Sequence, residues 1–440
     1  MTAEIAILNK QGLAIAADSA ITASRPSGDK IFTSANKIFA LSKFHPVCVM
    51  VYGNAAFMGV PWETIVKVYR KALGARAFRR LHEYALHFLS FLRTDQLLVT
   101  AKAQEAYVRG AIFSYLAYMK KELDSSLRSK IEKGPIGRLT VRKAVADVID
   151  SHHKRWIHAP LFAGLAKDTV RKMRDRCAPI VEEAQRKTFE DLPISKQRRG
   201  KLLDIAVALF VRRPPGIRNQ SVSGVVFAGF GEDDTFPSLS SYLVQGVVDQ
   251  VLQAELDREA SIGDDLGAFI APFAQGEMVA LFMEGVNPDY QKAIEKDLAD
   301  IVQGLPGIVV DSLTNVNEEG KKALKTRIGP IAQGVLRQYI DKLKQYRHDT
   351  FVNPVVAAVA MLPKDELATM AESLVSLTSF KRRFSMESET VGGPTDVAVI
   401  SKGDGFVWIK RKHYFKLELN PHFSANYFRE AGHEDRASEQ

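Results

Sequence analysis

Three residues near the start of the chain could do chemistry together: Thr2, Asp18 and Lys37. A threonine hydroxyl is a weak nucleophile and needs an adjacent base before it can attack a carbonyl carbon. Thr2 becomes the first residue if Met1 is removed, and its side chain is small enough to permit that removal. The same residue types also occur without any reaction, since Asp18 could simply end a strand and Lys37 could be a solvated rim residue.

Two β-hairpins are predicted at the N-terminus, and their ends carry these residues. "EIAIL" (4–8) and "LAIAAD" (13–18) flank the turn sequence "NKQG", and "KIFAL" (37–41) and "PVCVMVYG" (46–53) form a second pair. β-Branched and aromatic residues bounded by turn residues are typical of strands. The catalytic candidates therefore all lie at the ends of predicted strands.

The segment that follows is predicted to be helical and basic. From about residue 62 to 210, apolar residues recur every three or four positions, as in "ETIVKVYRKAL". Residues 61–220 hold 33 Lys and Arg against 16 Asp and Glu, a local net charge of +17 in a chain of +9. Such asymmetry fits a nucleic-acid surface or an acidic partner, but helix faces in ordinary proteins are also basic. His152, His153 and His158 lie here and are predicted to be surface residues.

The C-terminal half mixes strands and helices. "SVSGVVFAGFG" (221–231) is strand-like, and residues 288–347 are predicted to be mostly helical, with an interruption at "GLPGIVV" (304–310). Residues 363–384 are predicted to be a helix whose early acids and late bases suit the helix dipole. Residues 395–412 are predicted to be a hairpin about "KGDG". One core of strands and helices, interrupted by a helical insertion, is the simplest account.

Short motifs at both ends carry a resemblance to a known superfamily. "TAEIAI", "AADSAIT", "ANKIFAL" and "VYGNAA" occur in this order at the N-terminus, and "DELATMAESLVSL" precedes "VGGPTDVAVISKGDGFVWI" near the C-terminus. These segments resemble proteasome β subunits and the related bacterial HslV peptidase, which are N-terminal-nucleophile hydrolases. The resemblance covers under a third of the chain, and the strands in the middle fit it loosely.

The resemblance implies an α+β fold, a four-layer αββα sandwich in which two packed sheets lie between helix layers. The core would consist of residues 1–64 and 220–420, with a helical elaboration at about 288–347. Residues 65–219 would form a basic helical insertion, and residues 421–440 a polar tail.

The resemblance also implies a role for each residue at the N-terminus. Thr2 would be the nucleophile, and the α-amine freed by removal of Met1, with an unperturbed pKa of about 7.7–8.0, would accept the hydroxyl proton. Lys37 would lower the pKa of that amine, and Asp18 would hold Lys37 in place. The backbone N–H of Gly53 would donate to the developing oxyanion.

Further site residues follow from the same resemblance. The family places an aspartate and a serine just before a double glycine, which corresponds to Gly392 and Gly393. Without a gap the first position is Ser388, and a one-residue shift would bring in Glu387 or Glu389, so this supporting residue stays open among the three. Four positions match the family's substrate pocket: Ile21, Ala35, Val51 and Ala55. All four are apolar, which predicts a preference for apolar side chains at the cleaved residue.

The implied function is threonine-type hydrolysis of amide bonds in peptides or proteins, without a metal or organic cofactor. The implied partners are the substrate, further copies of the chain in a homo-oligomer such as a closed ring, and a separate ATP-dependent unfoldase, because this chain has no phosphate-binding loop. Two alternatives remain: a small-molecule amidase of the same superfamily, and a catalytically inactive binding or assembly subunit that uses the basic helical insertion.

Composition indicates the compartment. The chain is 46% apolar and 25% charged, so we expect a packed core. No apolar run approaches the roughly 18–20 residues of a membrane span, and no signal-peptide pattern is present. Two distant cysteines, Cys48 and Cys177, cannot build a disulfide framework or a cysteine zinc site. We therefore expect a cytoplasmic protein that does not bind membranes, with nucleic acid as the less favoured partner.

Overall fold

The structure is a computed structural model that describes residues 2–25, 28–96, 98–132, 134–162, 165, 168–190, 192–213, 222–385, 391–413, 415–422 and 425. The chain divides into two compact units. The first consists of Met1–Cys48, Ala228–Ser238 and Ala260–Gln440, and the second of Val49–Phe227 and Leu239–Glu259. Of the helices in the described ranges, none has both the length and the apolar content to cross a membrane.

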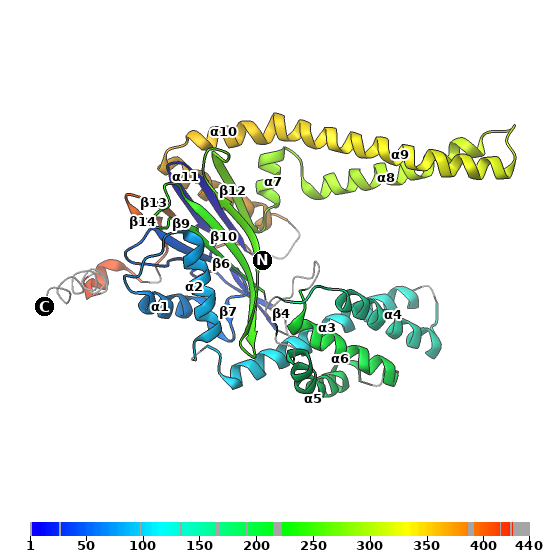
Figure 1. Ribbon diagram of the computed structural model, residues 1–440, viewed down its shortest axis with the longest axis horizontal. Helices are drawn as coiled ribbons and strands as arrows, with labels where there is room; N and C mark the ends of the chain where they lie inside the picture. The colour runs from blue at the N-terminus through cyan, green and yellow to red at the C-terminus, as the bar shows by residue number, and fades with distance from the viewer. Residues whose placement is uncertain are drawn as a thin grey trace. The chain divides into compact units, whose positions relative to one another are not determined.

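The first two strands of the chain belong to a five-stranded sheet in the first unit (Figure 1). Its strand order is β12 (Ala268–Ala274), β1 (Ala3–Asn9), β2 (Gly12–Ala17), β13 (Asp396–Ser401) and β14 (Gly405–Lys410). Every neighbouring pair is antiparallel. The predicted first hairpin and the predicted C-terminal hairpin are both confirmed. They join into one sheet because β13 pairs with β2.

Helix α11 (Lys364–Arg383) covers one face of this sheet. It buries a stripe of side chains at helical spacing: Leu367, Ala368, Ala371, Leu374, Val375 and Thr378. The odd-numbered residues of β1, Ala3, Ile5 and Ile7, belong to the same apolar cluster. Because side chains alternate along a strand, the even-numbered residues of β1 point to the opposite face of the sheet. The predicted helix over 363–384 is confirmed.

Further helices follow β12 in the first unit: α7 (Glu277–Glu284), α8 (Pro288–Asp311), α9 (Glu318–Arg347), the π-helical turn η1 (His348–Val352) and α10 (Asn353–Met361). Helices α8 and α9 pack side by side as a hairpin, drawn in light green and yellow in Figure 1. Most of α9 faces solvent, since none of its residues is buried.

The predicted interruption of this helical region at residues 304–310 is wrong. Helix α8 continues through Pro306 to Asp311. The break comes after Asp311, and Asn317 then caps α9 by accepting a hydrogen bond from the N–H of Gly320 at 2.8 Å. A proline inside a helix removes one backbone hydrogen bond, and the packing of α8 along α9 compensates for this loss.

A second five-stranded sheet has the order β11 (Val251–Ser261), β10 (Ser238–Val248), β9 (Ser223–Gly229), β6 (Val47–Gly53) and β5 (Ile38–Ala40). The second predicted hairpin is confirmed, because β5 and β6 are neighbours. Strand β9 lies within the predicted strand-like segment. Two short hairpins accompany the sheets: β3 (Ile21–Arg25) with β4 (Gly28–Phe32), and β7 (Ala56–Phe57) with β8 (Val60–Pro61).

The helices predicted between residues 62 and 210 are present in the second unit: α1 (Trp62–Leu73), α2 (Leu81–Thr94), α3 (Ala101–Ile131), α4 (Arg138–Ile157), α5 (Thr169–Phe189) and α6 (Lys196–Val211). Helices α3 to α6 share a hydrophobic core in which Ile112, Ile149, Cys177 and Leu202 are fully buried. This cluster supplies the apolar burial that holds the four helices together.

The prediction that His152 is a surface residue is wrong. Its ring is buried in the α3–α6 core, where its nitrogens lie 2.7 Å from the hydroxyl of Tyr115 and 3.0 Å from a carboxylate oxygen of Glu122. Burial is possible because both ring nitrogens have hydrogen-bond partners. His153 is half-buried beside Asp204, and His158 is exposed.

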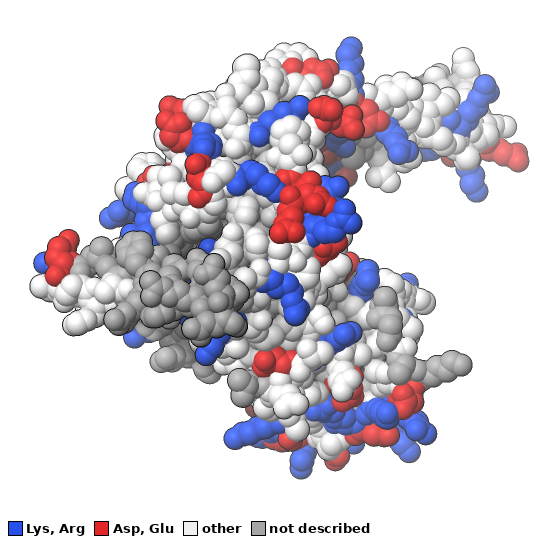
Figure 2. Space-filling model, turned by 60° about the vertical axis from the view of Figure 1, so that its left-hand side comes forward, with Lys and Arg blue, Asp and Glu red and all other residues white. Residues whose placement is uncertain are grey.

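Many Lys and Arg side chains of helices α3–α6 are paired with acids. The pairs include Arg198 and Lys201 with Asp150, Arg174 with Asp204, and Arg109 and Lys187 with Glu183. Figure 2 shows blue basic and red acidic side chains interspersed over the face that it presents. The positive charge of this segment is therefore partly neutralised within the fold.

Candidate active site

Thr2 lies immediately before β1 and is buried, with 5% of its surface exposed. Its hydroxyl donates a hydrogen bond to Oε2 of Glu4, 3.1 Å away. The two residues are two positions apart at the start of one strand, so their side chains share a face. A potential nucleophile is thus in direct contact with a potential base.

Asp18 follows β2 and is held by four donors. Its Oδ1 accepts from the N–H of Ala3 at 3.0 Å and from Nζ of Lys37 at 2.5 Å. Its Oδ2 accepts from the N–H groups of Ala20 at 3.2 Å and Gly392 at 3.0 Å. Hydrogen bonds from four donors, one of them charged, fix the position of this side chain. Asp18 is therefore a rigid anchor for Lys37.

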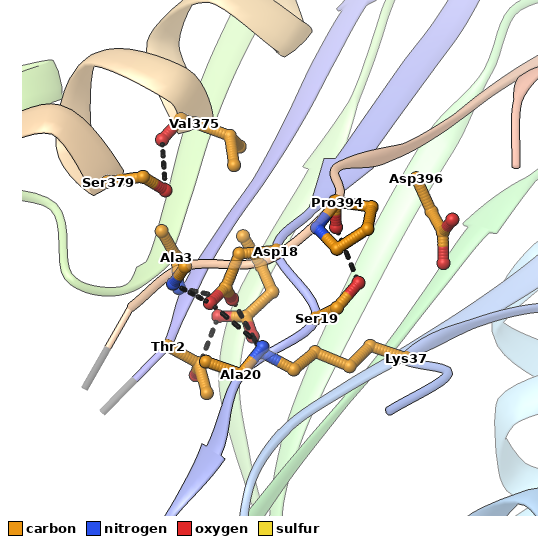
Figure 3. A network of polar contacts seen from close by, with 12 residues as sticks. Thr2, Ala3, Asp18, Ser19, Ala20, Lys37, Val375, Ser379, Pro394 and Asp396 are labelled. Carbon is orange, nitrogen blue, oxygen red and sulfur yellow. Dashed lines mark hydrogen bonds and ion pairs between the residues drawn. The ribbon is translucent and has the colours of Figure 1, made fainter. Parts of the chain in front are cut away.

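Lys37 enters the site directly before β5 and is 4% exposed. Its ammonium forms ion pairs with Asp18 and, at 3.1 Å, with Oε1 of Glu4. Figure 3 shows the Lys37 and Asp18 side chains meeting beside Thr2. The structure thus brings together Thr2, Asp18 and Lys37, all within the first unit.

Glu4 is the site residue that sequence reasoning missed. It is 2% exposed and lies opposite Ala17 of β2 and Phe273 of β12. The pKa of Glu4 is raised from 4.5 to about 7. Burial is the largest cause; the charge of Lys37 opposes the rise, the charge of Asp18 adds to it, and the hydrogen bond from Thr2 opposes it. One signal could have identified Glu4: it is the one charged residue in the otherwise apolar start of β1, "AEIAIL".

The double glycine supports the loop after β2. Ser19 donates its N–H to the carbonyl oxygen of Gly392 at 3.2 Å and its hydroxyl to that of Pro394 at 2.5 Å. Gly393 has φ = +78°, and a Cβ there would lie 2.9 Å from Thr33. Only glycine fits both constraints without strain. The chain around residues 392–394 therefore helps to fix the position of Asp18.

The other predicted site residues stay predictions. Glu387, Ser388 and Glu389 lie outside the described residues. Of the predicted pocket, Ile21 and Ala35 are half-buried residues of the first unit, whereas Val51 and Ala55 belong to the second.

Gly53, the predicted oxyanion donor, also belongs to the second unit. It has φ = +81°, and a Cβ there would lie 2.6 Å from the carbonyl oxygen of Val222. Both observations explain why this position is glycine, without reference to a substrate.

A cavity of about 390 Å³ lies elsewhere in the first unit, where α8, α9 and η1 meet. Its lining includes Glu284, Lys344 and Arg347, and none of the predicted site residues. Among the described residues, no group of three or more His, Cys, Asp and Glu side chains could hold a metal ion.

The sequence matches no protein-family model and no curated protein. Among solved structures, it is similar to Anbu (ancestral beta-subunit) from Yersinia bercovieri, with 9% identity over 98% of this chain and 97% of that chain and a TM-score of 0.28. It is also similar to an Anbu (Gly-1) mutant from Hyphomicrobium sp. strain MC1, with 10% identity over 99% and 97% and a TM-score of 0.24. At these TM-scores the likeness carries no argument about function, which we infer from the residues of this chain.

Proposed function

We propose that this chain is an N-terminal-nucleophile hydrolase that cleaves amide bonds, most readily in peptides, with the hydroxyl of Thr2. One observation carries the proposal: the buried Thr2 hydroxyl donates to Glu4, whose carboxylate is paired with Lys37. Nucleophilic catalysis by a hydroxyl requires a base in contact with it and a third group that holds the base in place. Here Glu4 is the base, and Lys37 is the group that holds it. Asp18 keeps Lys37 in position.

Removal of Met1 would expose the α-amine of Thr2, the proton acceptor that the resemblance implies, and the contact of the Thr2 hydroxyl with Glu4 offers a second acceptor. The hydroxyl oxygen attacks the carbonyl carbon of the substrate, the amine product leaves, and an ester at Thr2 remains. Water then hydrolyses this ester. The N–H of Gly53 would stabilise the oxyanion, and the four apolar pocket positions would favour apolar side chains at the cleaved residue.

The same proposal includes the architecture and assembly. The two five-stranded sheets would stack as the inner layers of a four-layer αββα sandwich, with α11 in an outer layer. Copies of the chain would form a homo-oligomer, and a separate ATP-dependent unfoldase would deliver protein substrates. Size measurement by light scattering would test the oligomer, because a protein that remains monomeric at micromolar concentration would contradict it.

The first experiment is intact mass and N-terminal sequencing of the purified protein, followed by reaction with a peptide β-lactone. Ring opening by the Thr2 hydroxyl adds the full mass of the lactone, and peptide mapping locates it. We expect a processed N-terminus, an adduct on Thr2, and neither adduct nor hydrolysis in Thr2→Ala. Retention of Met1, or hydrolysis by Thr2→Ala at the wild-type rate, would contradict the proposal. Casein, short peptides and small amides as parallel substrates separate a peptidase from a small-molecule amidase.

A further inference from the structure

Among the residues that the structure describes, the one carboxylate within hydrogen-bonding distance of the Thr2 hydroxyl belongs to Glu4. The carboxylate of Asp18 has other partners, because its two oxygens accept hydrogen bonds from three backbone N–H groups and from Lys37. The geometry therefore separates the roles of the two buried carboxylates. Asp18 positions the lysine, and Glu4 faces the hydroxyl.

We propose that Glu4 is the general base that activates Thr2 and the general acid that protonates the leaving amine. This inference rests on the proposed function. As Oγ1 of Thr2 bonds to the carbonyl carbon, its proton moves to Oε2 of Glu4. When the C–N bond breaks, that proton passes to the amine nitrogen, and an ester remains at Thr2.

The second half of the reaction uses the same carboxylate. Water attacks the carbonyl carbon of the ester and gives a proton to Glu4. The ester C–O bond breaks, the carboxylic acid product leaves, and the proton returns to Oγ1 of Thr2. Each proton taken up by Glu4 is released in the next step, so no further reactant is needed.

The surroundings of Glu4 suit a base that works near neutral pH. Its pKa is raised to about 7, mainly by burial. With this pKa the carboxylate is a stronger base than an exposed glutamate, and a useful fraction of it is still ionised at neutral pH. Lys37 opposes a further rise, and Asp18 acts in the other direction. The paired strands β2 and β12 contain no charged residue, and α11 covers the opposite face of the sheet. Removal of Met1 would add the α-amine of Thr2 to the titratable groups of the described chain that act on Glu4, which are Lys37 and Asp18.

The position of Glu4 is also costly for a residue with a purely structural role. Lys37 already has a counter-charge in Asp18, so an ionised Glu4 leaves one net negative charge in the buried group. An apolar or amide side chain opposite Ala17 and Phe273 would avoid that cost. Costly buried charges with strongly shifted pKa values occur frequently at functional sites.

The test compares the rate of β-lactone acylation at Thr2, between pH 5 and 9, in the wild-type protein and three variants. Glu4→Gln keeps the shape and a hydrogen-bond acceptor but removes the basicity. Thr2→Ala reports labelling at other sites. Asp234→Asn is the matched control, because Asp234 is a buried carboxylate that caps a turn through the N–H of Gly231.

We expect Glu4→Gln to acylate Thr2 on the order of 100-fold more slowly at pH 8, within the usual range for loss of a general base. Asp234→Asn should react at the wild-type rate. An equal rate and an unchanged pH profile in Glu4→Gln, with acylation still confined to Thr2, would overturn the role of Glu4 and leave the proposed function intact. Failure of the wild-type protein to label Thr2 would overturn both.

The protonation state of Glu4 can be measured directly, by a method that does not depend on hydrolytic activity. The infrared difference between the wild-type protein and Glu4→Gln, recorded across pH, isolates the carboxyl band of Glu4. We expect this carboxyl group to be protonated at pH 5, ionised at pH 9, and half-titrated near pH 7. A Glu4 carboxyl group fully ionised at pH 5 would contradict the inference, because so weak a base would accept little of the hydroxyl proton.

Discussion

Glu4→Gln should stabilise the first sheet at alkaline pH even as it slows the reaction. In the folded protein Glu4, Asp18 and Lys37 are buried together, with side-chain exposures of 0% for both carboxylates and 5% for the lysine. If all three are ionised, the group carries one excess negative charge. Glutamine removes that charge and leaves Lys37 paired with Asp18.

The magnitude follows from the pKa of Glu4. A rise from 4.5 in the unfolded chain to about 7 in the folded protein corresponds to roughly 3 kcal/mol, at 1.36 kcal/mol for each pKa unit. Between these two pH values Glu4 is protonated to a greater extent in the folded protein than in the unfolded chain. The contribution of Glu4 to the free energy of unfolding therefore falls as pH rises from 4.5 to about 7, and stays at the lower value above pH 7. Glutamine does not titrate, so the variant does not lose this stability.

Amide hydrogen exchange of peptides from β1 and β2 measures the opening of this sheet separately from the rest of the chain. At pH 8 we expect slower exchange in Glu4→Gln, by on the order of 100-fold for about 3 kcal/mol. At pH 5 the two proteins should differ little. Comparison at equal pH cancels the intrinsic pH dependence of exchange.

The opposite result would refute the reasoning. If Glu4→Gln exchanged faster than the wild-type protein at pH 8, the Glu4–Lys37 ion pair would be a net stabilising interaction. Removal of one partner from an isolated buried pair typically costs about 3–5 kcal/mol, because the other charge is left uncompensated. We expect no such loss here, since Asp18 remains as the partner of Lys37.

Three further predictions concern other parts of the fold. Lys37→Met leaves the buried carboxylates of Glu4 and Asp18 without a counter-charge. It should lower the free energy of unfolding by about 3–5 kcal/mol, and with it the thermal unfolding midpoint. An unchanged midpoint would show that the two carboxylates do not depend on the charge of Lys37. Gly393→Ala should destabilise by about 1–3 kcal/mol more than Gly59→Ala in denaturant unfolding, since both have positive φ (+78° and +84°) but only the former Cβ meets atoms within 4 Å; equal effects would exclude the steric contribution. Burial lowers the pKa of His152 below 6.5, so protection of α3 and α4 against hydrogen exchange should fall as pH drops below 6.5, and His152→Gln should abolish this dependence; an unchanged dependence would assign it to another group.

Local features of the chain were predictable because their signals are local. Alternating or continuous apolar runs bounded by turn residues predicted the hairpins of β1 with β2 and β13 with β14. Helical periodicity predicted α11 and the helices between residues 62 and 210. Strand ends also placed Thr2, Asp18 and Lys37 at positions from which they could meet. Secondary structure depends largely on neighbouring residues, so the sequence alone determined these elements.

The errors arose where distant segments decide the outcome. Gly-Pro spacing at residues 304–310 predicted a break, but packing against α9 keeps α8 continuous through Pro306. His152 was predicted to be exposed from its basic neighbours, yet Tyr115 and Glu122 from another helix satisfy its ring and allow its burial.

At the candidate site, Glu4 shows most clearly which properties follow from the sequence and which from the tertiary structure. By itself the sequence determined that a glutamate would stand in an apolar strand, two residues after a threonine. Only the tertiary structure decided that it is buried against Lys37, beside an Asp18 that is held by a glycine from the far end of the chain. The physical reason is that a carboxyl group's pKa and contacts depend on burial and on charges that long-range folding brings near it.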